Sequence, residues 1–207
     1  MVGMSGGVDS SVAAMLLREQ GYEVMGVTMK LFSDEDIVQA EKEGKTCCAL
    51  SDVSDARSVA RRLGFDHVVF NFRDVFREHV MEQFASSYLS GKTPNPCIEC
   101  NRHVKFDKML RRAMELGYDY IATGHYAVRE YDESSGRFLL KRPADRSKDQ
   151  TYVLYALTQE QLAHTLFPLG SLDKSQVRAL AEKAGLVNSN KPDSQDICFV
   201  PDGKYAD

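Results

Sequence analysis

The sequence predicts an α/β protein, in which an open parallel sheet is covered by helices on both faces. Apolar runs typical of strands alternate with helical runs along most of the chain. A glycine-serine loop at residues 3–11 passes directly into a helix, and Gly21, Gly64, Gly117 and Gly185 each follow a predicted helix. The length of 207 residues suits one domain, or a domain with a small appendage.

The first half of the chain is predicted to supply helices and strands in alternation. In chain order we expect a helix at 10–20, a strand at 22–29, a helix at 52–63, a strand at 67–70 and a helix at 74–88. Apolar residues recur on one side of the first helix, and Ser10 or Asp9 is expected to cap it. The acidic, polar stretch 33–45 is expected to be a mobile loop.

The second half changes character after Gly124. We expect a loop at 90–96, a helix at 103–116, a strand at 120–123, a small inserted hairpin at 126–142 and a helix at 174–184. The hairpin turn falls at Ser134-Ser135-Gly136. Residues 187–207 show no convincing periodicity.

Bulk composition is that of a soluble globular protein. The chain is 43% hydrophobic and 27% charged, and it has no apolar run long enough to span a membrane. The start carries no secretory leader, and five cysteines without a framework spacing favour a reducing compartment. We therefore expect a cytoplasmic protein without a membrane partner.

Charge alone does not decide whether the chain binds RNA. The net charge is −4, but cations crowd two stretches: Arg102, His103, Lys105, Lys108, Arg111 and Arg112, and then Lys141, Arg142, Arg146 and Lys148. Such patches can neutralise phosphates, although each is also what a solvated helix or hairpin face looks like.

The opening loop Gly3-Met4-Ser5-Gly6-Gly7-Val8-Asp9-Ser10-Ser11 indicates phosphate binding. Adjacent glycines allow close approach of the backbone, and a helix N-terminus presents N–H groups to an anion. No lysine follows the second glycine, so the loop is not that of kinases and GTPases. It resembles the Ser-Gly-Gly-x-Asp-Ser loop of the ATP pyrophosphatases, which adenylate a substrate; an ordinary strand-to-helix turn is the alternative.

Two cysteine segments point to thiol chemistry. They are Thr93-Pro94-Asn95-Pro96-Cys97-Ile98-Glu99-Cys100-Asn101 and Asp193-Ser194-Gln195-Asp196-Ile197-Cys198-Phe199, and both are expected to lie in loops. Cys100 precedes Arg102, His103 and Lys105, and cations beside a helix start lower the pKa of a thiol.

With these motifs the chain resembles the tRNA-specific 2-thiouridylases, a family of the ATP pyrophosphatase (PP-loop) superfamily. The resemblance runs from Gly3 to about Gly203. Besides the opening loop it includes Thr93-Pro94-Asn95-Pro96, Cys100-Asn101, Lys105-Phe106, Ala122-Thr123-Gly124-His125-Tyr126, Lys148-Asp149-Gln150, Phe167-Pro168-Leu169-Gly170 and Ile197-Cys198-Phe199.

The resemblance implies a role for each matched position. The ATP phosphates would be held by Gly3, Met4, Ser5, Gly6, Gly7, Val8, Asp9 and Ser10, and the adenosine by Met29 and Gly124. The target base would meet Asn95, Pro96 and Cys97, and the rest of the tRNA would meet Lys148, Asp149 and Gln150. Cys198 would carry a persulfide, and Cys100 would be its partner and nucleophile.

The resemblance also implies an architecture and a set of partners. The fold would be Rossmann-related, like that of the adenine nucleotide alpha hydrolases, with an ATP-binding catalytic domain at 1–142 and a helical tRNA-contacting segment at 143–207. ATP, Mg²⁺, tRNAs of the Glu, Gln and Lys type and a persulfide-carrying donor protein would take part in thiolation of the wobble uridine at C2. Because few residues precede Gly3 and the β-rich domains of the family are not present, we expect an abbreviated chain that binds ATP but turns over slowly.

Cys97 departs from the family pattern, in which many members carry aspartate. It creates Cys97-x-x-Cys100, which with Cys198 could hold an iron–sulfur cluster that delivers sulfide. Loop thiols without a metal are the simpler alternative, and zinc lacks an evident fourth ligand. An adenylating ligase that uses nitrogen, or a nucleotide- or RNA-binding fragment without catalysis, are the remaining alternatives.

Overall fold

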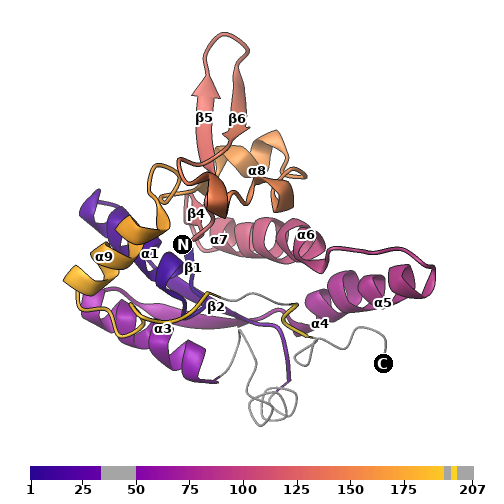
Figure 1. Ribbon diagram of the computed structural model, residues 1–207, viewed down its shortest axis with the longest axis horizontal. Coiled ribbons are helices and arrows are strands. Elements are labelled where there is room, and N and C mark those ends of the chain that lie inside the picture. Colours follow the sequence, from indigo (N-terminus) through magenta and orange to yellow (C-terminus); the bar gives the residue numbers. More distant parts are fainter. Residues whose placement is uncertain (34–49, 194–196, 200–207) are drawn as a thin grey trace.

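A parallel sheet forms the centre of the molecule, as predicted. The computed structural model describes residues 1–33, 50–193 and 197–199, and within them the sheet has five strands in the order β3-β2-β1-β4-β7 (Figure 1). The strands are β1 Val2–Gly3, β2 Gly26–Lys30, β3 His67–Asn71, β4 Ile121–Ala122 and β7 Thr165–Leu166. β7 pairs with β4 and was not predicted, and most of the loop predicted at 33–45 lies outside the described residues.

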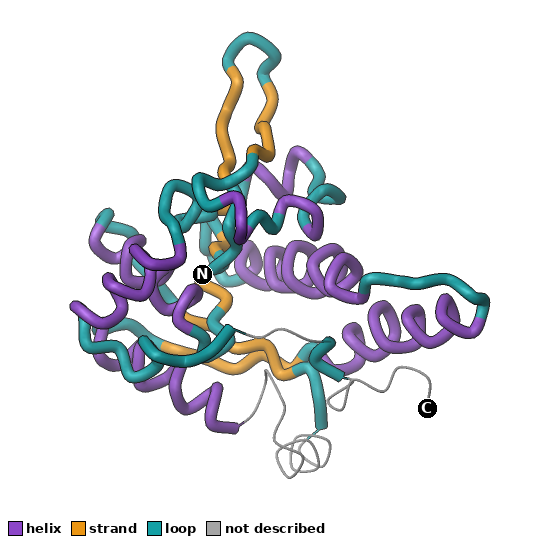
Figure 2. Tube along the Cα trace, viewed as in Figure 1, coloured by secondary structure: helices purple, strands orange, loops and turns teal. Residues whose placement is uncertain are grey.

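Helices cover both faces of this sheet, which confirms the predicted fold class (Figure 2). In chain order they are α1 Val8–Glu19, α3 Leu50–Leu63, α4 Arg73–Phe76, α5 Glu82–Leu89, α6 Pro96–Glu99, α7 Leu110–Glu115, α8 Gln159–Ala163 and α9 Lys174–Lys183. Residues of α1, α3 and α9 share one apolar cluster, whereas Ile98, Phe106, Met109, Leu110 and Ala113 belong to a second. Val2 packs in the first cluster and Met1 in the second, because successive strand residues face opposite sides of a sheet.

Two predicted helices differ from the prediction: each contains a π-helical stretch between α-helical segments, and we call each continuous helix a helical rod. The helix predicted at 74–88 is α4 and α5 joined by a π-helical stretch, Arg77–Met81. The helix predicted at 103–116 begins at Pro96 and runs through a second π-helical stretch, Cys100–Met109, into α7. Asn95 and Pro96 therefore start a helix, where the sequence pattern indicated the end of a loop.

The inserted hairpin is present as predicted. Strand β5, Val128–Asp132, pairs antiparallel with β6, Arg137–Lys141, and the hairpin stands away from the main sheet (Figure 1). Tyr131 and Phe138 face each other across the pair with ring centroids 5.0 Å apart. Among the described residues, no helix is both long and apolar enough to cross a membrane.

Candidate active site

The glycine-serine loop lies at the carboxyl end of β1, where the strand order of the sheet reverses. The chain continues to β2 and β3 on one side of β1, and to β4 and β7 on the other. The crevice at such a switch point is the usual ligand site of open α/β sheets. Gly3 ends β1, Met4 is buried, Ser5 is exposed, and Val8 begins α1.

Glycines are required at two places beside this loop. Gly6 has a φ of +74°, and a Cβ there would lie 2.7 Å from Cα of Asp52 at the start of α3. Gly124, just after β4, approaches the first turn of α1 so closely that a Cβ would lie 2.6 Å from the backbone nitrogen of Ser10. The loop is therefore enclosed by the backbone of two neighbouring elements.

The start of α1 suits an anion. Gly7 is its N-cap residue, and no side chain caps the helix, so the prediction that Ser10 or Asp9 does so is wrong. The hydroxyls of Ser10 and Ser11 point back and donate to the carbonyl oxygen of Gly7, at 3.2 and 3.0 Å. The first N–H groups of a helix lack partners within it, and here no side chain takes them, so they fit a phosphate.

Asp9 is held by residues from distant parts of the chain. Its carboxylate accepts from the Lys174 ammonium at 2.7 and 2.8 Å and from the Tyr126 hydroxyl at 3.0 Å. Burial and the neighbouring Asp9 carboxylate raise the pKa of Tyr126, which keeps that hydroxyl a donor. Lys174 also contacts Asp193 at 2.7 Å. Sequence reasoning missed Lys174, which lies 165 residues from Asp9.

The segment after α9 lies against the same loop. The Asn188 amide donates to the carbonyl oxygen of Gly6 and to the Ser11 hydroxyl, both at 2.9 Å. Lys191 pairs with Asp52 and Asp55 of α3 at 2.5 and 2.6 Å. This stretch showed no periodicity in the sequence, and its only signal is the matched motif that follows it.

The two positions predicted to line an adenosine pocket lie at the same edge of the sheet. Met29 is the fourth residue of β2 and is half-buried, and Gly124 follows β4. Next to Gly124, His125 is buried against Phe106 and its Nδ1 lies 2.7 Å from the Thr123 hydroxyl. Burial, followed by the charge of Lys105, holds the pKa of His125 well below its usual value.

The residues predicted to meet the target base form a helix start. The Asn95 side chain accepts from the backbone N–H of Cys97 at 3.0 Å, and Pro96 is buried at the first helical position. Cys97 is exposed. Asparagine at the N-cap and proline at the next position are a helix-start signal, which explains why this segment is not a loop.

Cys100 likewise lies within the helical rod, and the prediction that it sits in a loop is wrong. Two of the three residues that were expected to lower the pKa of its thiol pair with Glu99: Arg102 at 3.4 Å and His103 at 3.2 Å. Cys100 does not start the helix either, since that place belongs to Pro96 and Cys97.

The structure brings Cys100 and Cys198 to one apolar cluster. Both pack against the cluster built by Leu31, Phe32, Phe76, Val80 and Val104. Phe199, next to Cys198, is anchored there by Phe76 and Phe84, with ring centroids 5.9 and 5.3 Å away. The cluster lies beyond the carboxyl ends of β2 and β3, the edge of the sheet that also carries the glycine-serine loop.

An iron–sulfur cluster on Cys97, Cys100 and Cys198 finds no support. The described residues, which include these cysteines, contain no group of three or more His, Cys, Asp or Glu side chains arranged to hold a metal ion. Asp9 is the acidic residue in the first turn of α1, next to the glycine-serine loop.

The triplet Lys148-Asp149-Gln150 is tied into the protein. Lys148 donates to Asp193 at 2.9 Å, and the Asp149 carboxylate accepts from the hydroxyl of Thr151 at 2.7 Å. Gln150 accepts from the backbone N–H of Tyr126 at 3.0 Å. The 3₁₀ turn that follows, Thr151–Val153, packs against α6, which places the triplet near Asn95, Pro96 and Cys97.

Much of the basic charge noted in the sequence is paired within the chain. Arg111 binds Asp107, Arg112 binds Glu115, Lys141 binds Glu130 and Arg142 binds Asp149. These pairs are mostly exposed, so each can exchange its partner for a phosphate at little cost.

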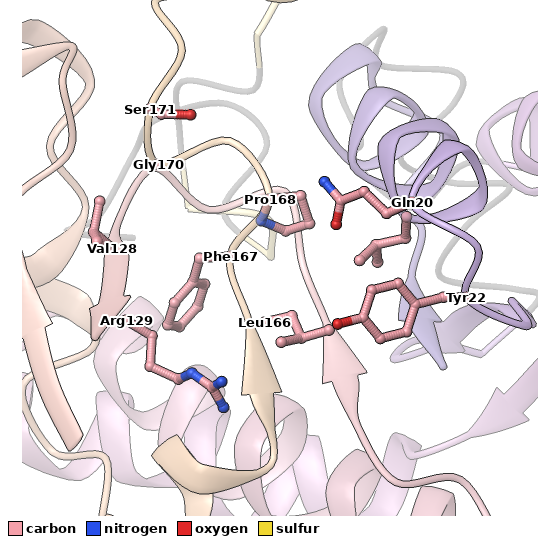
Figure 3. Close-up of a pocket in the computed structure, with 10 residues that line it drawn as sticks. Gln20, Tyr22, Val128, Arg129, Leu166, Phe167, Pro168, Gly170 and Ser171 are labelled. Atoms are coloured by element: carbon pink, nitrogen blue, oxygen red, sulfur yellow. The ribbon is translucent and has the colours of Figure 1, made fainter. Parts of the chain in front are cut away.

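A separate cavity of about 280 Å³ lies at the other end of α1 (Figure 3). Leu17, Gln20, Tyr22 and Phe167 line it together with Arg129. The Arg129 guanidinium is held by the carbonyl oxygens of Leu162 and Ala163 at 3.2 and 2.7 Å. None of the predicted site residues lines this cavity, so it is not part of the candidate site.

Comparison with known proteins agrees with the motifs. The family model described as the tRNA methyl transferase HUP domain matches residues 1–202. The tRNA-specific 2-thiouridylase MnmA of Clostridioides difficile (strain 630) is 58% identical over 206 residues, which cover 100% of this chain and 56% of that protein. The MnmA of Acetivibrio thermocellus is 57% identical over 205 residues, covering 99% and 57%. The resemblance to 2-thiouridylases is thereby confirmed, and the chain spans little more than half the length of these relatives.

Solved structures support the fold alone. An NMN synthetase from Francisella tularensis superimposes with a TM-score of 0.52 at 18% identity, covering 98% of this chain and 67% of that one. A glutamine-dependent NAD⁺ synthetase from Acinetobacter baumannii, in complex with adenosine diphosphate, gives a TM-score of 0.52 at 17% identity, covering 87% and 28%.

Proposed function

Since the chain belongs to the family of the tRNA methyl transferase HUP domain, we propose that it is the ATP-binding part of an enzyme that thiolates C2 of the wobble uridine of tRNA. One observation carries this proposal. An anion-binding loop and the cysteines Cys100 and Cys198 share one edge of the parallel sheet. Activation of a base by ATP and transfer of sulfur to it need both parts within reach of one substrate.

Activation comes first in the proposed reaction. The uracil O2 attacks the α-phosphorus of ATP, and pyrophosphate leaves, so that O2 becomes part of a good leaving group. The loop residues Gly3 to Ser10 hold the phosphates, and Met29 and Gly124 lie where the adenosine would rest. Mg²⁺ would neutralise phosphate charge; Asp9, which Lys174 and Tyr126 hold in place, is the carboxylate of residues 3–11 that could contact it.

Sulfur transfer follows. The terminal sulfur of a Cys198 persulfide attacks C2, AMP leaves, and the uracil is joined to Cys198 through a sulfur–sulfur bond. The Cys100 thiolate then attacks Sγ of Cys198, the sulfur remains on C2, and Cys100 and Cys198 become a disulfide. A thiol reductant restores the two thiols before a donor protein reloads Cys198. Disulfide formation requires their Cα atoms within about 7 Å, and packing on one apolar cluster supports that approach.

The substrate contacts rest on positions carried over from the resemblance. Asn95, Pro96 and Cys97 would meet the target base, and Lys148, Asp149 and Gln150 would contact the tRNA. Support comes from the contact of the turn after the triplet with α6. Acceptor tRNAs of the Glu, Gln and Lys type, a persulfide donor and a cytoplasmic location remain parts of the proposal. The description of the family model mentions methyl transfer, whereas the relatives are named 2-thiouridylases. We favour thiolation, because methyl transfer gives Cys100 and Cys198 no role.

Mass spectrometry of tRNA tests the function. We expect 2-thiouridine after incubation of the full-length protein with tRNA, ATP and a persulfide donor. Cys100→Ser and Cys198→Ser should abolish the product. Thiolation by both serine variants, or no pyrophosphate release in the presence of tRNA, would contradict the proposal.

A further inference from the structure

The phosphate-binding loop contains no cation of its own. Residues 3–11 include no lysine or arginine. The ammonium of Lys174, which begins α9, lies 2.7 and 2.8 Å from the carboxylate oxygens of Asp9 in the first turn of α1. We propose that Lys174 is the phosphate-binding cation of this loop. The inference rests on the proposed binding of ATP and adds a residue to its site.

The position of Lys174 is fixed by its own helix. Asp173 caps α9, with the backbone N–H of Gln176 bonded to its carboxylate at 2.8 Å and the Gln176 side chain returning to the backbone N–H of Asp173 at 2.9 Å. The backbone N–H of Lys174 donates to Asp145 at 3.1 Å. Val177 is buried in the cluster that α9 shares with α1. The ammonium is therefore presented to the loop from a rigid base.

Two carboxylates surround this ammonium, and they differ in their other partners. The Lys174 side chain is only 13% exposed and contacts both Asp9 and Asp193. Asp193 also binds Lys148 at 2.9 Å and Arg178 at 3.4 Å, so it keeps cations when Lys174 leaves it. A phosphate arriving at the loop can thus replace Asp193 beside Lys174. The exchange leaves no buried charge without a partner, which is the arrangement that a partly buried ion pair requires.

Comparison of two ligands isolates the phosphate contact. Dissociation constants of the 207-residue chain are measured by calorimetry for ATP with Mg²⁺ and for adenosine, which lacks phosphates. Lys174→Gln should weaken ATP about tenfold or more, as expected for loss of a charge-assisted contact, and should change adenosine less than twofold. Lys183→Gln, an exposed lysine at the other end of α9, is the matched control and should change neither. Equal weakening of both ligands, or no change in ATP, would overturn the proposal.

A second variant keeps Lys174 and tests the competition. Asp193→Asn removes the carboxylate that competes with phosphate, so ATP should bind severalfold tighter while adenosine stays unchanged. Weaker or unaltered ATP binding would overturn the exchange, even if Lys174→Gln fails to fold. If the unaltered chain binds neither ATP nor adenosine, the proposed function itself fails, which separates that outcome from failure of the Lys174 assignment.

Discussion

Gly6 combines a positive φ with close approach of the backbone of a neighbouring helix. Its φ of +74° costs a residue with a side chain about 1–2 kcal/mol, and a Cβ there would also press on the backbone of Asp52. Gly117, with a φ of +82°, has nothing within 4 Å of such a Cβ. Comparing the two positions separates backbone strain from close approach.

We predict that Gly6→Ala lowers the free energy of unfolding by about 2–4 kcal/mol and removes ATP binding, since the loop and α3 must part. Gly117→Ala should cost only about 1 kcal/mol, the strain alone. Urea denaturation gives both values, and calorimetry gives the affinity. Equal losses of stability in the two variants would contradict the role assigned to Asp52.

His125 makes the stability of the fold depend on pH. Burial first and Lys105 second hold its pKa well below 6.5 in the folded state, so below pH 6.5 only the unfolded chain takes up the proton. The stability that the neutral ring provides is complete above pH 6.5 and is lost as the pH falls toward the folded pKa. Carboxylates with lowered pKa values, such as Asp193, make stability depend on pH only below about pH 4.

We predict that the free energy of unfolding falls between pH 6.5 and 5 by about 1 kcal/mol or more per pH unit, and that His125→Gln flattens this slope. Urea denaturation at pH 8, 6.5 and 5 measures it. Part of the slope should persist, because burial and Arg57 also lower the pKa of His67. A slope unchanged in His125→Gln would show that the ring titrates normally.

At the residue scale, the residues that could be predicted from the sequence are those that belong to a local motif. The adjacent glycines Gly6 and Gly7 indicated a positive φ, which Gly6 has, and a matched motif singled out Gly124, which lies against the first turn of α1. Lys174 and Asn188 could not be found in this way, because their partners Asp9 and Gly6 lie 165 and 182 residues away. An ion pair between distant segments leaves no spacing in the sequence.

At the scale of elements, the start of the rod that carries Cys97 and Cys100 depends on Asn95. Its side chain caps the helix through the N–H of Cys97. We predict that Asn95→Ala lowers the free energy of unfolding by about 1 kcal/mol, whereas Asn95→Asp retains it because the carboxylate still accepts this bond. Thermal or urea denaturation measures the difference. An equal loss in both variants would mean that the amide nitrogen, and not the cap, stabilises the turn.

The start of one helix and one short strand were not predicted from the hydrophobic pattern of the sequence. Apolar periodicity located this helix near 103–116, but its first turns carry Pro96, Cys97 and Cys100, and Pro94 precedes them, a pattern more typical of a loop than of an amphipathic helix. The strand β7 was missed because only Thr165 and Leu166 belong to it, too few residues to show alternation. Long helices with glycine ends, such as α1 and α9, were predicted closely.

At the scale of the whole molecule, the C-terminal part completes the site that the N-terminal part begins. Residues 174–193 contact the loop at Asp9 and Gly6 and the start of α3 at Asp52. These contacts cross the domain boundary between residues 142 and 143 that the sequence suggested, and that boundary stays a prediction. Sheet order places the loop at the centre, between the two halves of the sheet.

Asn188 tests this long-range closure. Its buried amide is the donor to the Gly6 carbonyl and the Ser11 hydroxyl, both at 2.9 Å. Asn188→Ala would leave the Gly6 carbonyl without that partner, at a cost of about 1–3 kcal/mol in the free energy of unfolding. It should also weaken ATP binding severalfold, because Gly6 belongs to the loop. Asn190→Ala is the matched control: Asn190 is exposed in the same segment, and both values should stay unchanged. Urea denaturation and calorimetry measure the pair, and equal behaviour of the two variants would show that the segment merely lies beside the loop without holding it.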